Sequence, residues 1–338
     1  QALALLGVRP RWAEGSGRVI DVEVIPAALL GRPRVDVMLR ISGFFRDAFP
    51  SVVQMFDAAV QAVAALDGED ETENPIRARI EQERAQLQAA GMAEDAALRQ
   101  ASWRVFGAPA GHYGSGLQGL FQTGAWQSED DLARAYLQWS AFAYGQDGEG
   151  VPALDALQRR MGQLDVALQN QDSREHDVLD SGDYFQFQGG MAAAAKHLSG
   201  KQPALYHGDH ANPQHAQVRS LREEISRVVR ARVTNPKWIA GAKRHGYKGA
   251  FEMAATVDYL FGFDATTQQV GDHHYAMVTD AYLLDADTRE FLENNNPQAM
   301  RDIAERLLEA IQRGLWKEPA EYRQTLEDLL LDHEQNME

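Results

Sequence analysis

The order in which strand-like and helix-like segments follow one another is the feature that most constrains this chain. The segment from Arg34 to Ile41 is rich in β-branched residues and alternates imperfectly, as strands do. It runs through Ser42-Gly43 into a long apolar-periodic segment from Phe44 to Leu66, in which Pro50 marks the expected start of the main helix. A strand, a tight turn and a helix in this order form one unit of an α/β fold.

The alternation continues to about Tyr206. Further strand candidates cover residues 18–25, 166–170 and 204–207. The segment 189–198 is expected to be a helix between the last two strands, and the chain is expected to be helical from Ser220 onward. We therefore predict an α/β fold, with Rossmann-like strand and helix alternation in the first two thirds and a helix-rich C-terminal third. The expected regions are 1–219, which is α/β, and 220–338, which is mainly helical.

Composition excludes several classes of protein. Of the 338 residues, 44% are hydrophobic and 24% are charged, which is a globular balance rather than that of a disordered chain or a fibrous rod. No stretch of about eighteen apolar residues occurs, so we expect no membrane span. The chain has no cysteine, which fits the reducing cytoplasm and leaves only His, Asp and Glu to bind a metal.

The charge balance limits the partners. The formal net charge is -16, so the surface as a whole repels nucleic-acid phosphate, and we expect no nucleic-acid partner. The segment from Arg227 to Lys248 is different, because it holds seven basic residues and no acidic one, interleaved with Trp238 and Tyr247. Aromatic rings and guanidinium groups suit a flat ligand that carries carboxylates. The alternative interpretation of this basic segment is a solvated helix face that packs on the acidic rest of the protein.

A glycine-rich loop is expected at residues 106–123. Within it, Gly114-Ser-Gly-Leu-Gln-Gly119 matches the dinucleotide fingerprint, but the required strand before it and acidic strand end after it are missing. A nicotinamide-dependent oxidoreductase therefore stays an unfavoured alternative, and the loop is expected to approach some ligand or partner closely. The phosphate-binding motif GxxxxGK[ST] is absent, so we do not expect this chain to hydrolyse ATP by itself.

Two polar clusters follow strand candidates. Asp172-Ser-Arg-Glu-His-Asp177 comes directly after the strand that ends at Asn170, and His207-Gly-Asp-His210 follows the next strand. The carboxyl ends of strands are where ligands bind in open α/β sheets. Carboxylates and imidazoles there suit proton transfer or a divalent cation, although the spacing matches no standard metal motif. The alternative is two ordinary polar loops.

Several short motifs occur in the order seen in one family. They are Gly31-Arg-Pro-Arg-Val-Asp-Val37, Ser42-Gly-Phe-Phe-Arg-Asp47, Tyr113-Gly-Ser-Gly-Leu117, Ala143-Tyr-Gly145, Asn170-Gln-Asp-Ser173, Asn235-Pro-Lys-Trp238 and His245-Gly-Tyr-Lys-Gly249. Up to about Trp316, the chain resembles the C-terminal portion of the large subunits of cobaltochelatase (CobN type) and magnesium chelatase. Asp172 to Asp177 and Tyr184 to Gly190 resemble the cobalt branch.

The resemblance implies insertion of Co²⁺, as a substrate, into the corrinoid hydrogenobyrinic acid a,c-diamide of cobalamin biosynthesis. It also implies that ATP is hydrolysed on separate AAA+ chelatase subunits and not on this chain. Family members are several times longer, and the chain begins at Gln1 in what reads as the middle of a helix, so we expect a longer subunit whose N-terminal part is missing here. The alternatives are insertion of Mg²⁺ into protoporphyrin IX and a non-catalytic docking module for the AAA+ subunits.

Metal insertion requires a base for the ring N–H protons and exchangeable oxygen or imidazole ligands for the metal. We expect Glu175, His176 and Asp177 to assist deprotonation or metal transfer. The metal-ligating candidates are His176, His207, Asp209 and His210. The candidates for substrate binding are Arg174, Tyr113, Gly114, Gly116, Arg230, Lys237 and Trp238. Arg174 and part of the basic segment would meet carboxylates or dock the ATPase subunits.

Overall fold

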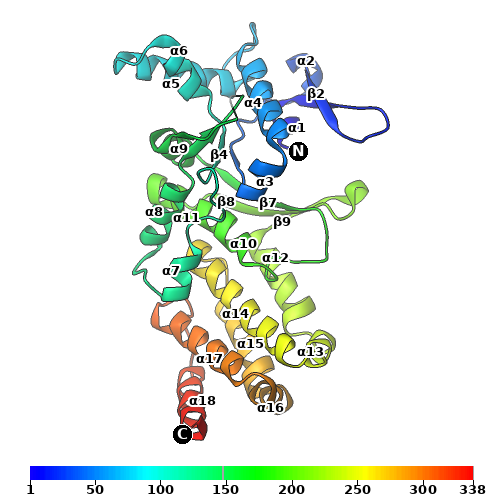
Figure 1. Cartoon of the computed structure of the whole chain (residues 1–338), viewed down its shortest axis with the longest axis vertical. Helices are drawn as coiled ribbons and strands as arrows, with labels where there is room; N and C mark the ends of the chain where they lie inside the picture. The colour runs from blue at the N-terminus through cyan, green and yellow to red at the C-terminus, as the bar shows by residue number, and fades with distance from the viewer. Residues whose placement is uncertain (147, 338) are drawn as a thin grey trace. The chain divides into compact units, whose positions relative to one another are not determined.

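The computed structural model describes residues 1–146 and 148–337 (Figure 1). The chain divides into two compact units, each built from two segments. Unit 1 consists of residues 1–116 and 134–163, and unit 2 consists of residues 117–133 and 164–338. The expected boundary between residues 219 and 220 lies inside unit 2 and stays a prediction.

Unit 1 contains two small sheets. Helix α1 (Ala2–Leu6) leads into an antiparallel pair, β1 (Val8–Trp12) and β2 (Val19–Val24). The second sheet has the order β3-β4-β5-β6, formed by β3 (Leu39–Arg40), β4 (Val105–Gly107), β5 (Phe142–Tyr144) and β6 (Val151–Pro152). Only β3 and β4 are parallel in it.

The expected strand at Arg34 to Ile41 is much shorter in the structure, because the backbone amides of Arg34 and Val35 donate to the carbonyl groups of Glu73 and Leu5 and not to a neighbouring strand. The buried Arg34 guanidinium donates to the carbonyl groups of Leu6 and Gly7 at 3.0 and 3.1 Å and pairs with Glu69 at 2.7 Å. The strand therefore begins only at Leu39, which pairs with Val105.

Helices complete unit 1. They are α2 (Ala27–Leu30), α3 (Gly43–Ala48), α4 (Pro50–Ala64), α5 (Pro75–Ala89), α6 (Glu94–Ser102) and α9 (Leu154–Met161). The predicted start of the main helix at Pro50 is confirmed. Its buried face, which includes Val53, Phe56 and Val60, packs in a core with Leu6 and Val105. The boundary between the two units falls within helix α8 (Glu129–Trp139), because residues up to 133 belong to unit 2 and residues from 134 belong to unit 1.

Unit 2 contains one three-stranded sheet of the order β7-β8-β9. Strands β7 (Val166–Gln171) and β8 (Ala204–Asp209) are parallel, and β9 (Gln217–Ser220) is antiparallel to β8. The connection from β7 to β8 consists of α10 (Gly182–Tyr184), the π-helical turn η1 (Phe185–Gly189) and α11 (Gly190–Ser199). The predicted strand, helix, strand order of this region is confirmed.

The rest of unit 2 is helical, as predicted for the C-terminal third. Its elements are α7 (Gln118–Thr123), η2 (Pro213–His215), α12 (Leu221–Val228), η3 (Val229–Val233), α13 (Pro236–Lys243), α14 (Tyr247–Thr267), α15 (Asp272–Thr279), η4 (Asp280–Leu284), α16 (Ala286–Asn295), α17 (Pro297–Gln312) and α18 (Tyr322–Met337). None of the described helices has the length and apolar character needed to cross a membrane. The predicted α/β class is confirmed, with small mixed sheets and a helix-rich C-terminus.

Candidate functional site

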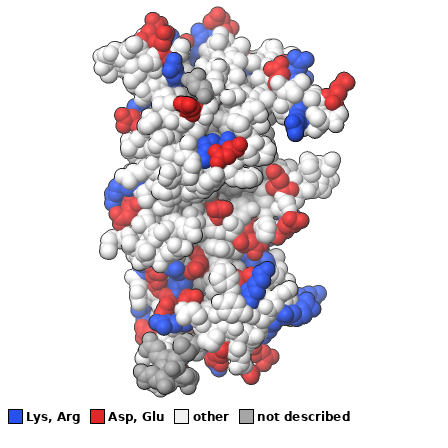
Figure 2. Space-filling view, in the orientation of Figure 1, with Lys and Arg blue, Asp and Glu red and all other residues white. Residues whose placement is uncertain are grey.

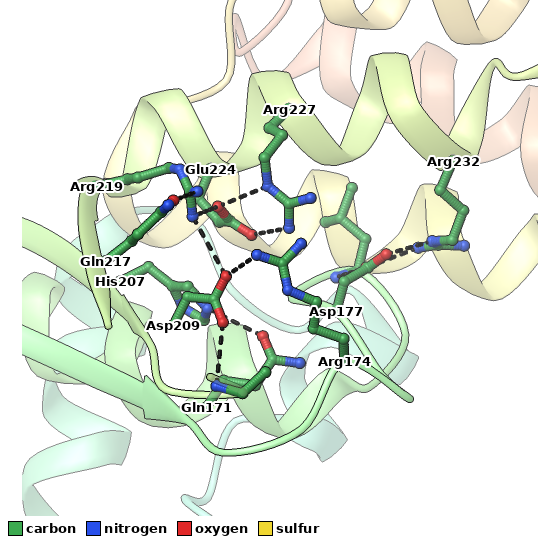
Figure 3. Close-up of polar contacts among 12 residues, drawn as sticks. Gln171, Arg174, Asp177, His207, Asp209, Gln217, Arg219, Glu224, Arg227 and Arg232 are labelled. Atoms are coloured by element: carbon green, nitrogen blue, oxygen red, sulfur yellow. Dashed lines mark hydrogen bonds and ion pairs between the residues drawn. The ribbon is translucent and has the colours of Figure 1, made fainter. Parts of the chain in front are cut away.

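The carboxyl ends of the parallel strands β7 and β8 lie together, since Gln171 is paired with Asp209 in the sheet register. A dense set of charged side chains surrounds this edge, contributed by the strand ends, the loop 172–181 after β7, strand β9 and the helical segment α12–η3 (Figure 3). We call this set the charged network. Its members are Arg174, Asp177, Asp180, Asp209, Arg219, Glu224, Arg227 and Arg232.

Asp209 connects the two strand ends to β9. Its carboxylate accepts a hydrogen bond from Arg174 and lies 3.5 Å from the Arg219 guanidinium. Burial raises the pKa of Asp209, but the Ala211 amide and the two arginines outweigh burial and hold that pKa below its ordinary value. Asp209 is therefore an anion that two guanidinium groups already neutralise.

Glu224 is the second acid of the network and is fully buried. Ser220 and Glu223 form a capping box that fixes the start of α12 and so sets Glu224 in its first turn. Glu224 accepts from Arg227 Nε at 3.0 Å and from Arg219 Nη1 at 3.4 Å. Burial raises the pKa of Glu224, but these arginines outweigh it and the net shift is downward.

His207 lies buried beside the network. Its Nε2 atom is 3.0 Å from Gln171 Oε1, an acceptor, so Nε2 is assigned the proton. Its Nδ1 atom has no hydrogen-bond partner in the described part of the chain. Burial lowers the pKa of His207, so the ring is a neutral imidazole with one unpaired nitrogen.

The metal-ligating candidates are not assembled as a cluster. Among residues 1–146 and 148–337, no three His, Asp or Glu side chains are grouped so that they could hold a metal ion. His207 is buried against Gln171, His176 is exposed, and Asp209 is held by arginines. The assignment of His176, His207, Asp209 and His210 to metal binding stays a prediction.

The loop 172–181 is held at both ends. Arg174 pairs with Asp209 near its start, and Arg232 forms a two-point pair with Asp177 further along, at 2.5 and 3.0 Å. Arg232 also lies 3.2 Å from Asp180 and over the ring of Trp238, with its guanidinium carbon 5.1 Å from the ring centre. These contacts fix the backbone on either side of residues 175 and 176.

Glu175 and His176 lie between those two attachment points. Both are exposed, and in the described part of the chain neither side chain makes a hydrogen bond or an ion pair. An exposed carboxylate and an imidazole are side chains of the kind that serve as general bases. Asp177 differs from them, because Arg232 occupies both of its oxygens. Of the three predicted catalytic residues, Asp177 is thus the least accessible to a substrate proton.

The structure divides the basic segment from Arg227 to Lys248 into two groups. Arg227 and Arg232 point into the charged network and are neutralised there. Arg230 and Lys237 are exposed and form no ion pair within the described residues, and Trp238 is half-buried beneath Arg232. Figure 2 shows Lys and Arg side chains gathered at the edge formed by α13. The exposed group is the part available to a ligand.

The remaining substrate-binding candidates lie in unit 1. The irregular part of the glycine-rich loop is 108–117, shorter than expected, because β4 and α7 flank it. Arg46 holds the loop by donating to the carbonyls of Ala108 and Pro109 at 3.1 and 2.8 Å. Gly116 has φ +84°, and a Cβ there would lie 2.8 Å from the Cβ of Trp139, so only glycine fits.

Gly114 and Tyr113 have different surroundings. Gly114 also has φ +84°, and its carbonyl accepts from Arg40 at 2.9 Å. Tyr113 is 58% exposed, and its hydroxyl donates to Asp47 at 2.7 Å. The two glycines therefore serve the shape of the loop, while Tyr113 presents an aromatic ring at the surface. Their assignment to substrate binding stays a prediction.

Sequence reasoning missed two members of the network, Arg219 and Glu224. Arg219 lies in a four-residue strand and Glu224 in an ordinary helix turn, and neither position carries a motif. The spacing of Ser220 and Glu223 could have located the start of α12, and thereby Glu224 and Arg227 on its first turns.

Comparisons with known proteins give consistent results. The family model for CobN/Magnesium Chelatase matches residues 1–323. The chain is 59% identical over 335 residues to the aerobic cobaltochelatase subunit CobN of Pseudomonas aeruginosa, covering 99% of this chain and 27% of that protein. It is 39% identical over 321 residues to a magnesium-chelatase subunit of Cereibacter sphaeroides, covering 95% of this chain and 26% of that protein.

A solved structure gives the same result. The catalytic subunit of cobaltochelatase from Mycobacterium tuberculosis superposes with a TM-score of 0.92 and 50% identity, covering 98% of this chain and 28% of that one. The chain thus spans between a quarter and a third of the length of the relatives it matches.

Proposed function

The chain belongs to the CobN/magnesium chelatase family, and on that premise we propose that it forms part of the large, tetrapyrrole-binding subunit of a cobaltochelatase. The reaction is insertion of Co²⁺ into hydrogenobyrinic acid a,c-diamide, with ATP hydrolysed on separate AAA+ subunits in the cytoplasm. The observation that carries the cobalt assignment is the identity of 59% to a cobaltochelatase subunit, against 39% to a magnesium-chelatase subunit over a similar length.

The proposed chemistry rests on the loop 172–181. Metal insertion removes protons from the ring nitrogens while the cation loses bound water, so a proton acceptor must reach the ring. Glu175 and His176 are exposed acceptors of this loop, and the pairs Arg174–Asp209 and Arg232–Asp177 support the backbone on either side of them. The exposed cations Arg230 and Lys237 supply charge for the carboxylates of the macrocycle.

The test uses the full-length subunit together with its ATPase partners. Glu175→Gln and His176→Ala are each expected to slow Co²⁺ insertion, followed by absorbance, by about a hundredfold, the size of a typical general-base contribution. Corrinoid binding, followed by fluorescence quenching, is expected to change far less. Asp172→Asn is the matched control, because Asp172 is an exposed acid of the same loop. Unchanged turnover in both variants would remove the catalytic assignment.

The runner-up is insertion of Mg²⁺ into protoporphyrin IX, supported by the relatives of the magnesium branch. The two functions differ in the macrocycle that is bound. We expect the corrinoid, and not protoporphyrin IX, to quench the fluorescence of the subunit. The opposite preference would favour the magnesium reaction.

A further inference from the structure

Arg232 ties the loop after β7 to the end of the helical segment α12–η3. Its guanidinium group forms the two-point pair with Asp177, lies 3.2 Å from Asp180 and donates to Thr256 Oγ1 of α14 at 3.3 Å. The ring of Trp238 packs against the same group. The Arg232 side chain is only 13% exposed, so water and salt screen these contacts little.

A π-helical turn brings Arg232 to this position. α12 and η3 form one continuous helix, at whose end the Thr234 amide donates to the carbonyl of Val229, five residues back, at 2.9 Å. This wider turn holds one more residue than an α-helical turn, so Arg232 faces the charged network together with Arg227. With α-helical spacing, Ala231 would face the network instead. π-helical turns are rare, and many of them occur at functional sites.

Asp177 links this pair to the backbone of the loop. Its amide donates to Asp180 Oδ2 at 2.8 Å, and the Asp180 amide donates to the carbonyl of Asp177 at 3.0 Å. The Leu179 amide donates to Asp177 Oδ1 at 2.9 Å, and the Leu179 side chain is fully buried. Residues 177–180 therefore form one closed turn, and His176 is joined to that turn by a single peptide bond. A shift of Asp177 would move the backbone of His176 with it.

The attachment that precedes Glu175 is weaker. Arg174 pairs with Asp209 through Nη2, but the Arg174 side chain is 56% exposed. Water and salt screen an exposed pair, whereas a buried two-point pair fixes both distance and orientation. Of the two attachments, the one made by Arg232 (Figure 3) therefore contributes more to the placement of the loop.

We propose that Arg232 is a positioning residue for metal insertion. It acts through Asp177 and sets the place of Glu175 and His176. This rests on the proposed function, in which those two side chains accept the protons of the macrocycle. In this role Arg232 does not touch the macrocycle, so its loss slows the insertion step and leaves binding of the macrocycle unchanged. A misplacement of about 1 Å is enough to slow a reaction about a hundredfold.

The experiment measures single-turnover Co²⁺ insertion by the full-length subunit with its ATPase partners, followed by absorbance. Arg232→Gln is expected to lower the rate constant for insertion about thirtyfold and to leave the dissociation constant of the corrinoid within about twofold of wild type. Arg232→Lys keeps the charge without the two-point geometry, so it should slow insertion only about fivefold.

The matched control is Arg306→Gln in the same unit. Arg306 is 18% exposed, pairs with Asp258 at 2.6 Å and lies over the ring of Phe261, outside the charged network. Its substitution breaks a similar set of contacts, so it should lower the melting temperature by a similar amount and leave the rate constant for insertion within about twofold of wild type.

A cycle of variants tests whether Arg232 acts through the loop. Added to Glu175→Gln/His176→Ala, Arg232→Gln should slow insertion by less than about twofold more, because the side chains that it places are already removed. If Arg232→Gln does not fold, Arg232→Lys takes its place, and its loss of about fivefold should likewise vanish in the triple variant.

Three outcomes overturn the proposal: a full further loss in the triple variant, a wild-type rate in Arg232→Gln, or an equal loss in Arg306→Gln. The proposed function fails separately, through wild-type rates in both Glu175→Gln and His176→Ala. Slow insertion in those two variants beside a wild-type rate in Arg232→Gln refutes the positioning role alone.

Discussion

Arg232 is the residue on which the loop 172–181 most depends. It contacts Asp177, Asp180 and Trp238, and its side chain and that of Asp177 are only 13% and 17% exposed. Removing one member of such a pair leaves the other charge poorly solvated, so Arg232→Met should lower the free energy of unfolding by about 3 kcal/mol. Urea denaturation measures this loss.

A double-mutant cycle tests whether the loss comes from the pair. Arg232→Met combined with Asp177→Leu should be less destabilising than the sum of the two single variants, by at least about 1 kcal/mol. Additive losses would mean that Arg232 acts through its other contacts, such as Asp180 and Trp238, and not through Asp177.

The buried His274 should make the free energy of unfolding depend on pH. Its Nδ1 accepts from the Gly271 amide at 3.0 Å and its Nε2 lies 2.9 Å from Ser226 Oγ, so the buried ring is neutral. Burial, together with His273, Arg230 and Arg222, lowers the pKa of His274 to about 4. Since the unfolded value is about 6.5, the unfolded chain binds the proton first as pH falls.

The free energy of unfolding should therefore lose up to about 1.4 kcal/mol per pH unit from this group between about pH 6.5 and 4. Urea denaturation at a series of pH values measures the slope, and His274→Gln should reduce it. An unchanged slope in the variant would assign the effect to other groups.

Asp264 should change the free energy of unfolding with pH in the opposite direction to His274. It is buried and accepts from the Tyr275 hydroxyl at 2.9 Å, and burial raises the pKa of Asp264 to about 7. The folded chain keeps a proton that the unfolded chain releases near pH 4, so this contribution to stability is lost as pH rises from about 4 to about 7. Asp264→Asn should become progressively more stable than wild type over that range of pH. A constant difference between the two proteins would contradict the raised pKa.

The helix pair α13–α14 depends on one glycine and not on another. A Cβ on Gly249 would lie 1.9 Å from the Ala242 carbonyl oxygen, which is backbone and cannot move aside. Gly249→Ala should therefore cost about 2 kcal/mol or more of unfolding free energy. Gly241 lies within α13, and its Cβ would meet nothing closer than 3.7 Å, so Gly241→Ala should stabilise by about 0.5–1 kcal/mol. Equal effects of the two substitutions in thermal unfolding would refute the close approach.

Elements with a strong local signal could be predicted from the sequence. Pro50 begins α4, the strands at 166–171 and 204–209 flank a helix, and Ser220 caps α12. Strands β4, β5 and β6 were not predicted, because two or three residues are too few to show alternation and depend on their neighbours for pairing.

The charged network could not be predicted for a different reason. Four arginines and four carboxylates allow many pairings, and the sequence does not tell which of them the fold brings within reach. Arg174 meets Asp209 and Arg232 meets Asp177 only because α12 and η3 return to the carboxyl ends of β7 and β8. The sequence showed that residues 172–177 are rich in charged side chains, but it did not show that the pairs Arg174–Asp209 and Arg232–Asp177 hold this segment in place.

At the scale of the whole chain, each unit is assembled from segments that are far apart in sequence. Residues 117–133 belong to unit 2 although residues 134–163 return to unit 1. Trp126 anchors this segment in unit 2, since it is buried, lies 5.7 Å from the ring of Phe121 and 6.2 Å from that of Phe261, and carries the Arg313 guanidinium 3.7 Å above its ring centre. The Arg313 side chain also donates to the Trp126 carbonyl at 2.9 Å.

Trp126→Ala should therefore destabilise the chain by about 3–5 kcal/mol, through lost burial and the cavity left behind. Trp12→Ala is the matched control, because the same atoms are removed from a side chain that is 60% exposed, and its cost should stay near 0.5 kcal/mol. Far-UV circular dichroism in urea compares the two without depending on tryptophan emission. Hydrogen exchange should further show lost protection in α14 and α17, which carry Phe261 and lead to Arg313. Similar costs for both substitutions would mean that the segment 117–133 contributes little to the core of unit 2.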